Sequence, residues 1–107
     1  MKEILNFING EFVKNASGKT FEDRNPVDNS VIGQVFEAGK PEVDAAVAAA
    51  KAALKGPWGQ LSVVERVKML DAVANEINRR FDDFLQAEIA DTGKPAHLAS
   101  HIDIPRG

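Results

Sequence analysis

The hydrophobic period of the chain changes near Pro41, and this change separates a β-rich half from a helical half. Before it, short apolar segments alternate with turn-forming residues, a pattern typical of strands. After it, apolar residues such as Val43 and Val47 recur at the three- and four-residue intervals of a helix face. Strands followed by helices predict α+β-like local organisation. We expect a β segment over about 1–40 and a helical segment over about 41–107.

Three turns divide the predicted β segment into short strands. Asn-Gly at 9–10 is the strongest hairpin signal, because both residues of such a turn must accept positive φ. Turn-forming residues recur at 16–19 and at 25–29, and a β-rich strand follows at 31–36. We therefore expect a small antiparallel meander, followed by three to four helices.

The first two predicted helices have recognisable starts. Pro41 and the acidic Glu42 suit a first helical turn, where the backbone needs one donor fewer and the macrodipole favours negative charge. The second helix begins with a capping box, in which Ser62 and Glu65 satisfy each other's backbone amides. Apolar residues over 63–77 are expected to form its buried face.

A third helix is predicted from Phe81 or Asp82 to Asp91, and its end is marked by Gly93 and Pro95. Glycine accepts the left-handed conformation that follows many helices, and proline cannot continue the hydrogen-bond ladder. Residues 96–102 then resemble the start of one more helix.

Composition excludes several classes of function. The chain has 107 residues, a net charge of −3, no cysteine and two histidines. We therefore expect no disulfide, no thiol nucleophile and no multi-histidine zinc site. Its largest basic cluster is Arg79-Arg80, too little for nucleic-acid binding. There is no apolar run long enough to span a bilayer and no secretory signal, so we expect a cytoplasmic location.

Six motifs in order carry a family resemblance. They are 7–12 (FINGEF), 25–27 (NPV) with 31–35 (VIGQV), 42–51 (EVDAAVAAAK), 57–58 (PW), 65–66 (ER) and 91–95 (DTGKP). Together they resemble the N-terminal part of an NAD(P)-dependent aldehyde dehydrogenase. The text at 101–107 (HIDIPRG) is most similar to the 2-hydroxymuconic and 2-aminomuconic semialdehyde dehydrogenase branch.

This resemblance implies an α/β fold with a Rossmann-type cofactor domain, to which residues 1–107 contribute the N-terminal part. Members oxidise an aldehyde with NAD through a cysteine thiolate and a glutamate-activated water. In such proteins the cysteine, the glutamate and the Gly-rich cofactor loop lie beyond the position of Gly107. No catalytic or cofactor-binding residue is therefore assigned here, and the chain is expected to be an inactive fragment of a parent enzyme. The parent is expected to be a dimer or tetramer that takes a small aldehyde.

Two site assignments follow from the resemblance. Arg106 is expected to line the substrate channel, where a guanidinium matches the carboxylate of a semialdehyde substrate; the alternative is an ordinary surface arginine. Asp91 and the backbone carbonyl of Arg24 are expected to help hold a monovalent cation, with a further ligand supplied from elsewhere. The alternative for Asp91 is a local contact with amides near the helix end.

Other interpretations of the chain stay open from sequence alone. The substrate could be a betaine-type or aliphatic aldehyde, or the chain could be a small α+β interaction module without enzymatic activity. His97 and His101 lie four residues apart but are interpreted as surface histidines. Trp58 is interpreted as a packing anchor over a helix end.

Overall fold

The structure, a computed structural model, describes residues 2–107 and contains five strands followed by a series of helices. The strands are β1 (Lys2–Ile4), β2 (Asn6–Ile8), β3 (Glu11–Val13), β4 (Thr20–Arg24) and β5 (Val31–Phe36). The helices are α1 (Lys40–Ala53), α2 (Pro57–Gln60), α3 (Val63–Arg79), α4 (Phe81–Thr92), α5 (Ala96–Leu98), the π-helical turn η1 (Ala99–Asp103) and α6 (Ile104–Arg106). The predicted change from strands to helices near Pro41 is confirmed.

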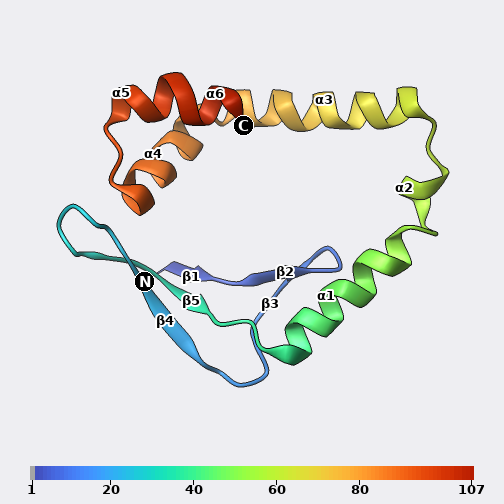
Figure 1. Cartoon of the computed structure of the whole chain (residues 1–107), viewed down its shortest axis with the longest axis horizontal. Coiled ribbons are helices and arrows are strands. Elements are labelled where there is room, and N and C mark those ends of the chain that lie inside the picture. Colours follow the sequence, from blue (N-terminus) through green and yellow to red (C-terminus); the bar gives the residue numbers. More distant parts are fainter. Residues whose placement is uncertain (1) are drawn as a thin grey trace.

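The elements form a flat plate of 47 × 38 × 16 Å. The strands lie together, α1 leads away from them, and α3 runs along the opposite side of the molecule (Figure 1). α4 then turns toward the strands, and α5 to α6 run back along the same side of the molecule as α3 (Figure 1). The radius of gyration is 17.0 Å, whereas a compact domain of this length has about 13 Å. No helix within residues 2–107 is long and apolar enough to cross a membrane.

The predicted hairpin at 9–10 is confirmed, but the predicted meander is wrong. Asn9 and Gly10 have φ of 53° and 83°, and β2 pairs antiparallel with β3. These two strands form a sheet of their own. A second sheet has the order β1-β5-β4, in which β1 is parallel to β5 and β4 is antiparallel to it. Turn signals specify only neighbouring antiparallel strands, so they carry no information on the long-range pairing of β1.

A buried carboxylate joins the β segment to the start of α1. Glu42 is 8% exposed; its Oε1 accepts from the Ala16 amide at 2.7 Å and its Oε2 from the Gly39 amide at 2.8 Å. These two bonds hold the pKa of Glu42 below its usual range, with the bond from Ala16 the larger cause. The acidic first turn predicted for this helix is thus also a tertiary contact.

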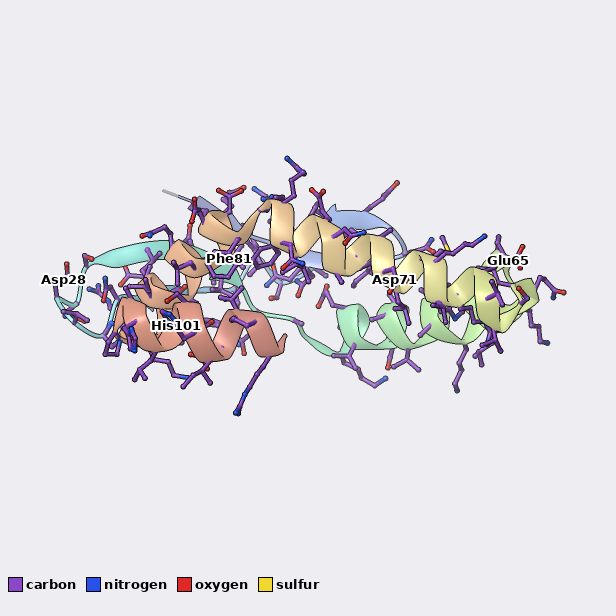
Figure 2. All side chains as sticks on the ribbon, turned by 90° about the horizontal axis from the view of Figure 1, so that it is seen from above. Asp28, Glu65, Asp71, Phe81 and His101 are labelled. Carbon is purple, nitrogen blue, oxygen red and sulfur yellow. The ribbon has the colours of Figure 1, made fainter. Side chains whose placement is uncertain are left out.

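The capping box of α3 is confirmed, but its predicted buried face is wrong. Ser62 Oγ accepts from the Glu65 amide at 3.2 Å, and Glu65 Oε2 accepts from the Ser62 amide at 2.7 Å. The apolar residues Val63, Val67, Leu70 and Val73 are nevertheless 74%, 49%, 60% and 56% exposed. The reason is that α3 extends away from the part of the molecule that carries Asp28 and His101, as Figure 2 shows.

The interior of the described residues is correspondingly small. Phe36 and Ala99 are the buried apolar side chains within residues 2–107. The accessible surface is 8077 Å² for a mass of 11.6 kDa, roughly 2,000 Å² more than a compact monomer of that mass exposes. The elements are therefore set by local signals and by the two sheets more than by a common core.

Candidate functional site

The DTGKP tract at 91–95 ends α4 as predicted. Gly93 has φ of +68°, and its amide donates to the Ile89 carbonyl at 2.9 Å, which closes the helix. Thr92 Oγ1 donates to the Glu88 carbonyl at 2.7 Å. The last turn is thereby fixed immediately after Asp91.

This tract lies directly on the turn at 25–29. A Cβ atom added to Gly93 would be 2.9 Å from Pro26 Cγ and 3.2 Å from Val27 Cγ2. The turn is itself rigid, because the Asn25 amide donates to Ser30 O at 2.9 Å and the Val27 amide to Asn25 Oδ1 at 2.9 Å. Two motifs that are far apart in the sequence are thus neighbours in the structure.

Beside this contact, the carboxyl groups of Asp23 and Asp91 face each other from β4 and α4. Both line a cavity of about 340 Å³, together with Lys2, Ile4 and Ile104. Desolvation raises the pKa of Asp23, and the neighbouring carboxyl group of Asp91 raises it further. Lys2 acts in the opposite direction. The Asp23 carboxyl group, with Asp91 beside it, therefore favours the uptake of positive charge, either a proton or a cation.

The two residues predicted to hold a cation lie on α4 and on β4. Asp91 supplies a carboxylate, and Arg24 directly follows Asp23, at a register irregularity between β4 and β5. The Arg24 side chain turns to its own loop, where Nη1 donates to Asn29 O at 2.8 Å and the guanidinium pairs with Glu22. The carboxylate of Asp91 and the backbone carbonyl of Arg24 are oxygen donors, which suit a hard cation. Within residues 2–107 no group of three or more His, Asp or Glu residues gathers as a metal site.

Arg106 lies in a different part of this region. It is exposed at the end of α6, and its guanidinium forms no hydrogen bond or ion pair within residues 2–107. Its helix is tied to the DTGKP tract, because Lys94 Nζ donates to both carboxylate oxygens of Asp103 at 2.9 Å. That bond raises the pKa of Lys94. The structure thus brings Asp91 close to the turn after Arg24, and the guanidinium of Arg106 has no partner among residues 2–107.

Two contacts in this region were not predicted from the sequence. The first is the proximity of Asp23 to Asp91. It depends on how β4 lies against a helix that follows more than fifty residues later, and no sequence motif indicates this contact. The pair Lys94–Asp103 spans nine residues across a helix end. A lysine next to the helix terminus and an acid before the Ile-Pro-Arg triplet were its only available signals.

The remaining candidates have local partners. The ring of Trp58 is 44% exposed and lies 5.7 Å from the Arg66 guanidinium; a cation–π contact between α2 and α3 thus takes the place of the predicted helix-end packing. His97 and His101 are exposed, as predicted.

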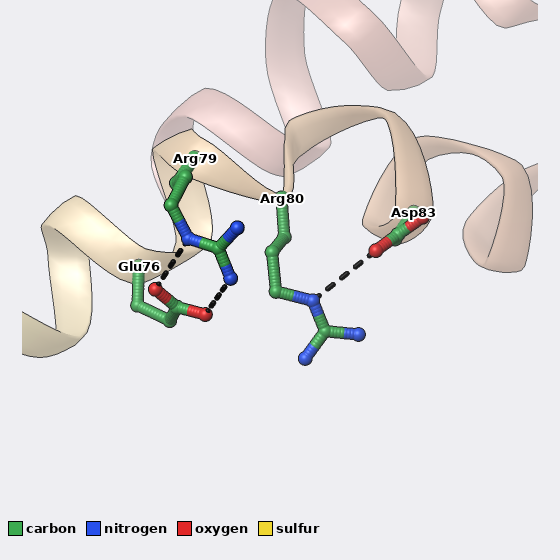
Figure 3. A network of polar contacts seen from close by, with 4 residues as sticks. All are labelled: Glu76, Arg79, Arg80 and Asp83. Carbon is green, nitrogen blue, oxygen red and sulfur yellow. Dashed lines mark hydrogen bonds and ion pairs between the residues drawn. The ribbon is translucent and has the colours of Figure 1, made fainter.

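The basic pair Arg79-Arg80 lies at the junction of α3 and α4 and is neutralised by neighbouring acids (Figure 3). Arg79 Nε and Nη2 donate to Glu76 at 2.8 and 2.5 Å, and Arg80 Nε donates to Asp83 at 3.1 Å. The bond with Arg79 lowers the pKa of Glu76. These arginines stabilise a helix junction and do not form a free positive patch.

Three observations indicate the same class of protein. They are the order of strands and helices, the contact of the DTGKP helix end with the Asn-Pro turn, and the comparisons with known proteins. The aldehyde dehydrogenase family model matches residues 12–107, and the chain belongs to the aldehyde dehydrogenase family. The α/β fold predicted from the resemblance is confirmed. A segment of an NAD⁺ complex of an aldehyde dehydrogenase from Bacillus cereus has a similar structure, with a TM-score of 0.93 and 41% identity over 97% of this chain and 21% of that one.

Within this family, the chain is similar to two semialdehyde dehydrogenases. It is 66% identical over 107 residues to a 2-hydroxymuconic semialdehyde dehydrogenase of Pseudomonas sp. strain CF600, which covers all of this chain and 22% of that protein. It is 51% identical to a 2-aminomuconic 6-semialdehyde dehydrogenase of Pseudomonas sp., over all of this chain and 21% of that protein. The chain spans about a fifth of the length of the relatives it matches.

Proposed function

We propose that this chain forms the N-terminal part of an NAD-dependent dehydrogenase that oxidises a 2-hydroxymuconate-type semialdehyde to the carboxylic acid during the degradation of aromatic compounds. One observation carries the proposal. Identity is 66% and 51% to relatives named for muconic semialdehydes, but 46% to an aldehyde dehydrogenase of Davidiella tassiana. Sequence similarity in this segment thus follows the substrate class named for the relatives.

Residues 1–107 would belong to the cofactor-binding domain of this enzyme, with NAD held by residues outside this chain. The similarity to a segment of an NAD⁺ complex supports NAD as the cofactor. We also propose that the whole enzyme is a homo-oligomer, a dimer or tetramer, that works in the cytoplasm. In this arrangement the described residues position the site and supply contacts to the substrate, and the covalent chemistry takes place elsewhere.

Arg106 is the proposed contact to the substrate. A semialdehyde of this class carries a carboxylate, and a guanidinium binds a carboxylate through two parallel hydrogen bonds. Arg106 is exposed, and the ion pair between Lys94 and Asp103 fixes the helix on which it lies. Asp91, at the start of the DTGKP tract, and the Arg24 carbonyl are the proposed cation ligands.

A chimeric enzyme tests the function. These 107 residues replace the matching segment of the Pseudomonas sp. strain CF600 enzyme, and NADH formation is followed with 2-hydroxymuconic semialdehyde, betaine aldehyde and propanal. We expect the chimera to prefer the semialdehyde. A soluble chimera that oxidises propanal or betaine aldehyde but not the semialdehyde would show that this segment serves another aldehyde.

Arg106→Ala in the same chimera tests the residue. A hydrogen bond to a charged group contributes about 1.5–3 kcal/mol, so KM for the semialdehyde should rise by about ten- to a hundred-fold while KM for propanal stays unchanged. Arg79→Ala is the matched control, because Arg79 is an exposed arginine paired within its own helix. An unchanged KM for the semialdehyde in the Arg106 variant would refute the assignment.

A further inference from the structure

The two histidines of the chain lie side by side on the C-terminal helical segment. α5, η1 and α6 run as one continuous helix (Figure 1), with His97 in α5 and His101 in η1. Their imidazole rings are exposed, their centroids are 4.4 Å apart and the ring planes differ by 37°. Both rings therefore leave the helix on the same side and point in similar directions.

Hydrogen bonding fixes the tautomer of one of these rings. His101 Nδ1 lies 2.8 Å from the His97 carbonyl oxygen and 2.9 Å from Ser100 Oγ. Since a carbonyl oxygen only accepts, the proton of the neutral ring is on Nδ1, and the lone pair is on Nε2. A metal-ligating histidine characteristically donates its other ring N–H to a backbone carbonyl or a carboxylate in this way. His101 is thus prepared as an Nε2 ligand before any ion binds.

The backbone between the two rings departs from ordinary helix geometry. The π-helical turn begins at Ala99, between His97 and His101, and includes His101. Such turns are rare and lie frequently at functional sites. The π turn is a feature of the backbone, so it is a separate observation from the contact between the two rings.

We propose that His97 and His101 form a two-imidazole binding site for a divalent transition-metal ion of the Zn²⁺, Ni²⁺ or Cu²⁺ class, bound through the ring nitrogens. Neutral imidazole suits these ions, whereas Mg²⁺ and Ca²⁺ require oxygen ligands. The nearest carboxylate in the sequence, that of Asp103, is engaged with Lys94 through both oxygens. The remaining coordination positions are open to water or to another ligand.

This site differs in chemistry from the pair Asp23–Asp91, which offers oxygen ligands to a hard cation. It does not depend on the proposed enzymatic function, because all of its atoms lie within one helical segment. Its occupation would hold α5 and η1 together in the segment that leads to Arg106. The ion would thereby stabilise the π turn.

Titration of the chimeric enzyme, in which this segment is folded against the rest of the protein, with Zn²⁺ or Ni²⁺ by calorimetry tests the site. We expect one ion per chain near neutral pH that the doubly substituted His97→Ala, His101→Ala variant does not bind, and no displacement by Mg²⁺. His97→Ala and His101→Ala should each lower the affinity by at least about tenfold, since loss of a mere supporting partner already costs that much. Asp103→Asn is the control and should leave the affinity unchanged.

Spectroscopy keeps the test decisive if a variant disturbs the helix. With Cu²⁺ bound to the unaltered chain, electron paramagnetic resonance should show coupling to two equivalent imidazole nitrogens. Coupling to a single nitrogen, or equal affinity in the chain and in both alanine variants, would overturn the proposal. Absence of binding with the ions in large excess would overturn it as well.

Discussion

Replacing Gly93 by alanine tests whether the DTGKP tract joins the helical half to the β half. Gly93 has φ of +68°, and its missing Cβ would lie 2.9 Å from Pro26 Cγ. Two separate costs therefore meet at this position, one from the backbone and one from the contact. Gly18 offers a matched control, because its φ is +71° and a Cβ there would meet no atom within 4 Å.

The magnitudes follow from these two costs. The left-handed conformation costs a non-glycine residue about 1–2 kcal/mol, and the lower entropy of the unfolded alanine chain offsets about 0.4–1 kcal/mol of this. Gly18→Ala should thus destabilise the protein by roughly 1 kcal/mol or less. Gly93→Ala adds the displacement of a rigid proline ring, and overpacking of this kind costs about 1–3 kcal/mol. We expect a total of roughly 2–4 kcal/mol.

The chimeric enzyme provides the assay, through the shift of its melting temperature in each variant. Unfolding of a large enzyme is not two-state, so the order of the two variants is the decisive result. Gly93→Ala should lower the melting temperature clearly more than Gly18→Ala. Equal shifts would show that the contact with Pro26 is absent in solution, and the neighbourhood of Asp91 and the Arg24 turn would then lose its support.

Two further predictions concern the carboxylates. Glu42→Gln should lower the melting temperature at about pH 7, because two hydrogen bonds hold the folded pKa of Glu42 below its unfolded value. The stability that Glu42 contributes is therefore present above the unfolded pKa and is lost as pH falls through the folded pKa. A difference in melting temperature between variant and parent that did not narrow in acid would contradict this contribution. K⁺ or Na⁺ should raise the melting temperature of the chimera relative to a bulky organic cation at equal ionic strength. Asp91→Asn should remove this effect, whereas Asp82→Asn, in the first turn of α4, should keep it. A melting temperature that does not depend on the cation would refute the proposed ligands.

The elements that the sequence predicts correctly are those whose backbone groups find partners a few residues away. The turn at 9–10, the capping box of Ser62 and Glu65, and the helix end at Gly93 are each complete within a short segment. For such signals the residue type and its spacing carry the physical cause. They are also the motifs on which the family resemblance rests.

The elements that the sequence misses depend on pairs far apart in the chain. β1 pairs with β5 from Lys2↔Gly33 to Ile4↔Val35. The three residues of β1 contain no signal that specifies a parallel partner. The site shows the same division. Asp91 could be assigned because a motif contains it, whereas Asp23 becomes its neighbour only through the tertiary contact between β4 and α4.

The wrong prediction for α3 is informative about where the stability of this segment comes from. Its apolar stripe has the spacing of a buried helix face, yet Val63 is 74% and Leu70 60% exposed. Soluble monomers rarely expose continuous apolar patches of more than a few hundred Å². At the same time, the segment has the shape of its counterpart in a longer aldehyde dehydrogenase, with a TM-score of 0.93. Local signals therefore determine the conformation, while the free energy that holds it has to come from contacts to the α3 stripe that the interior of these residues does not supply.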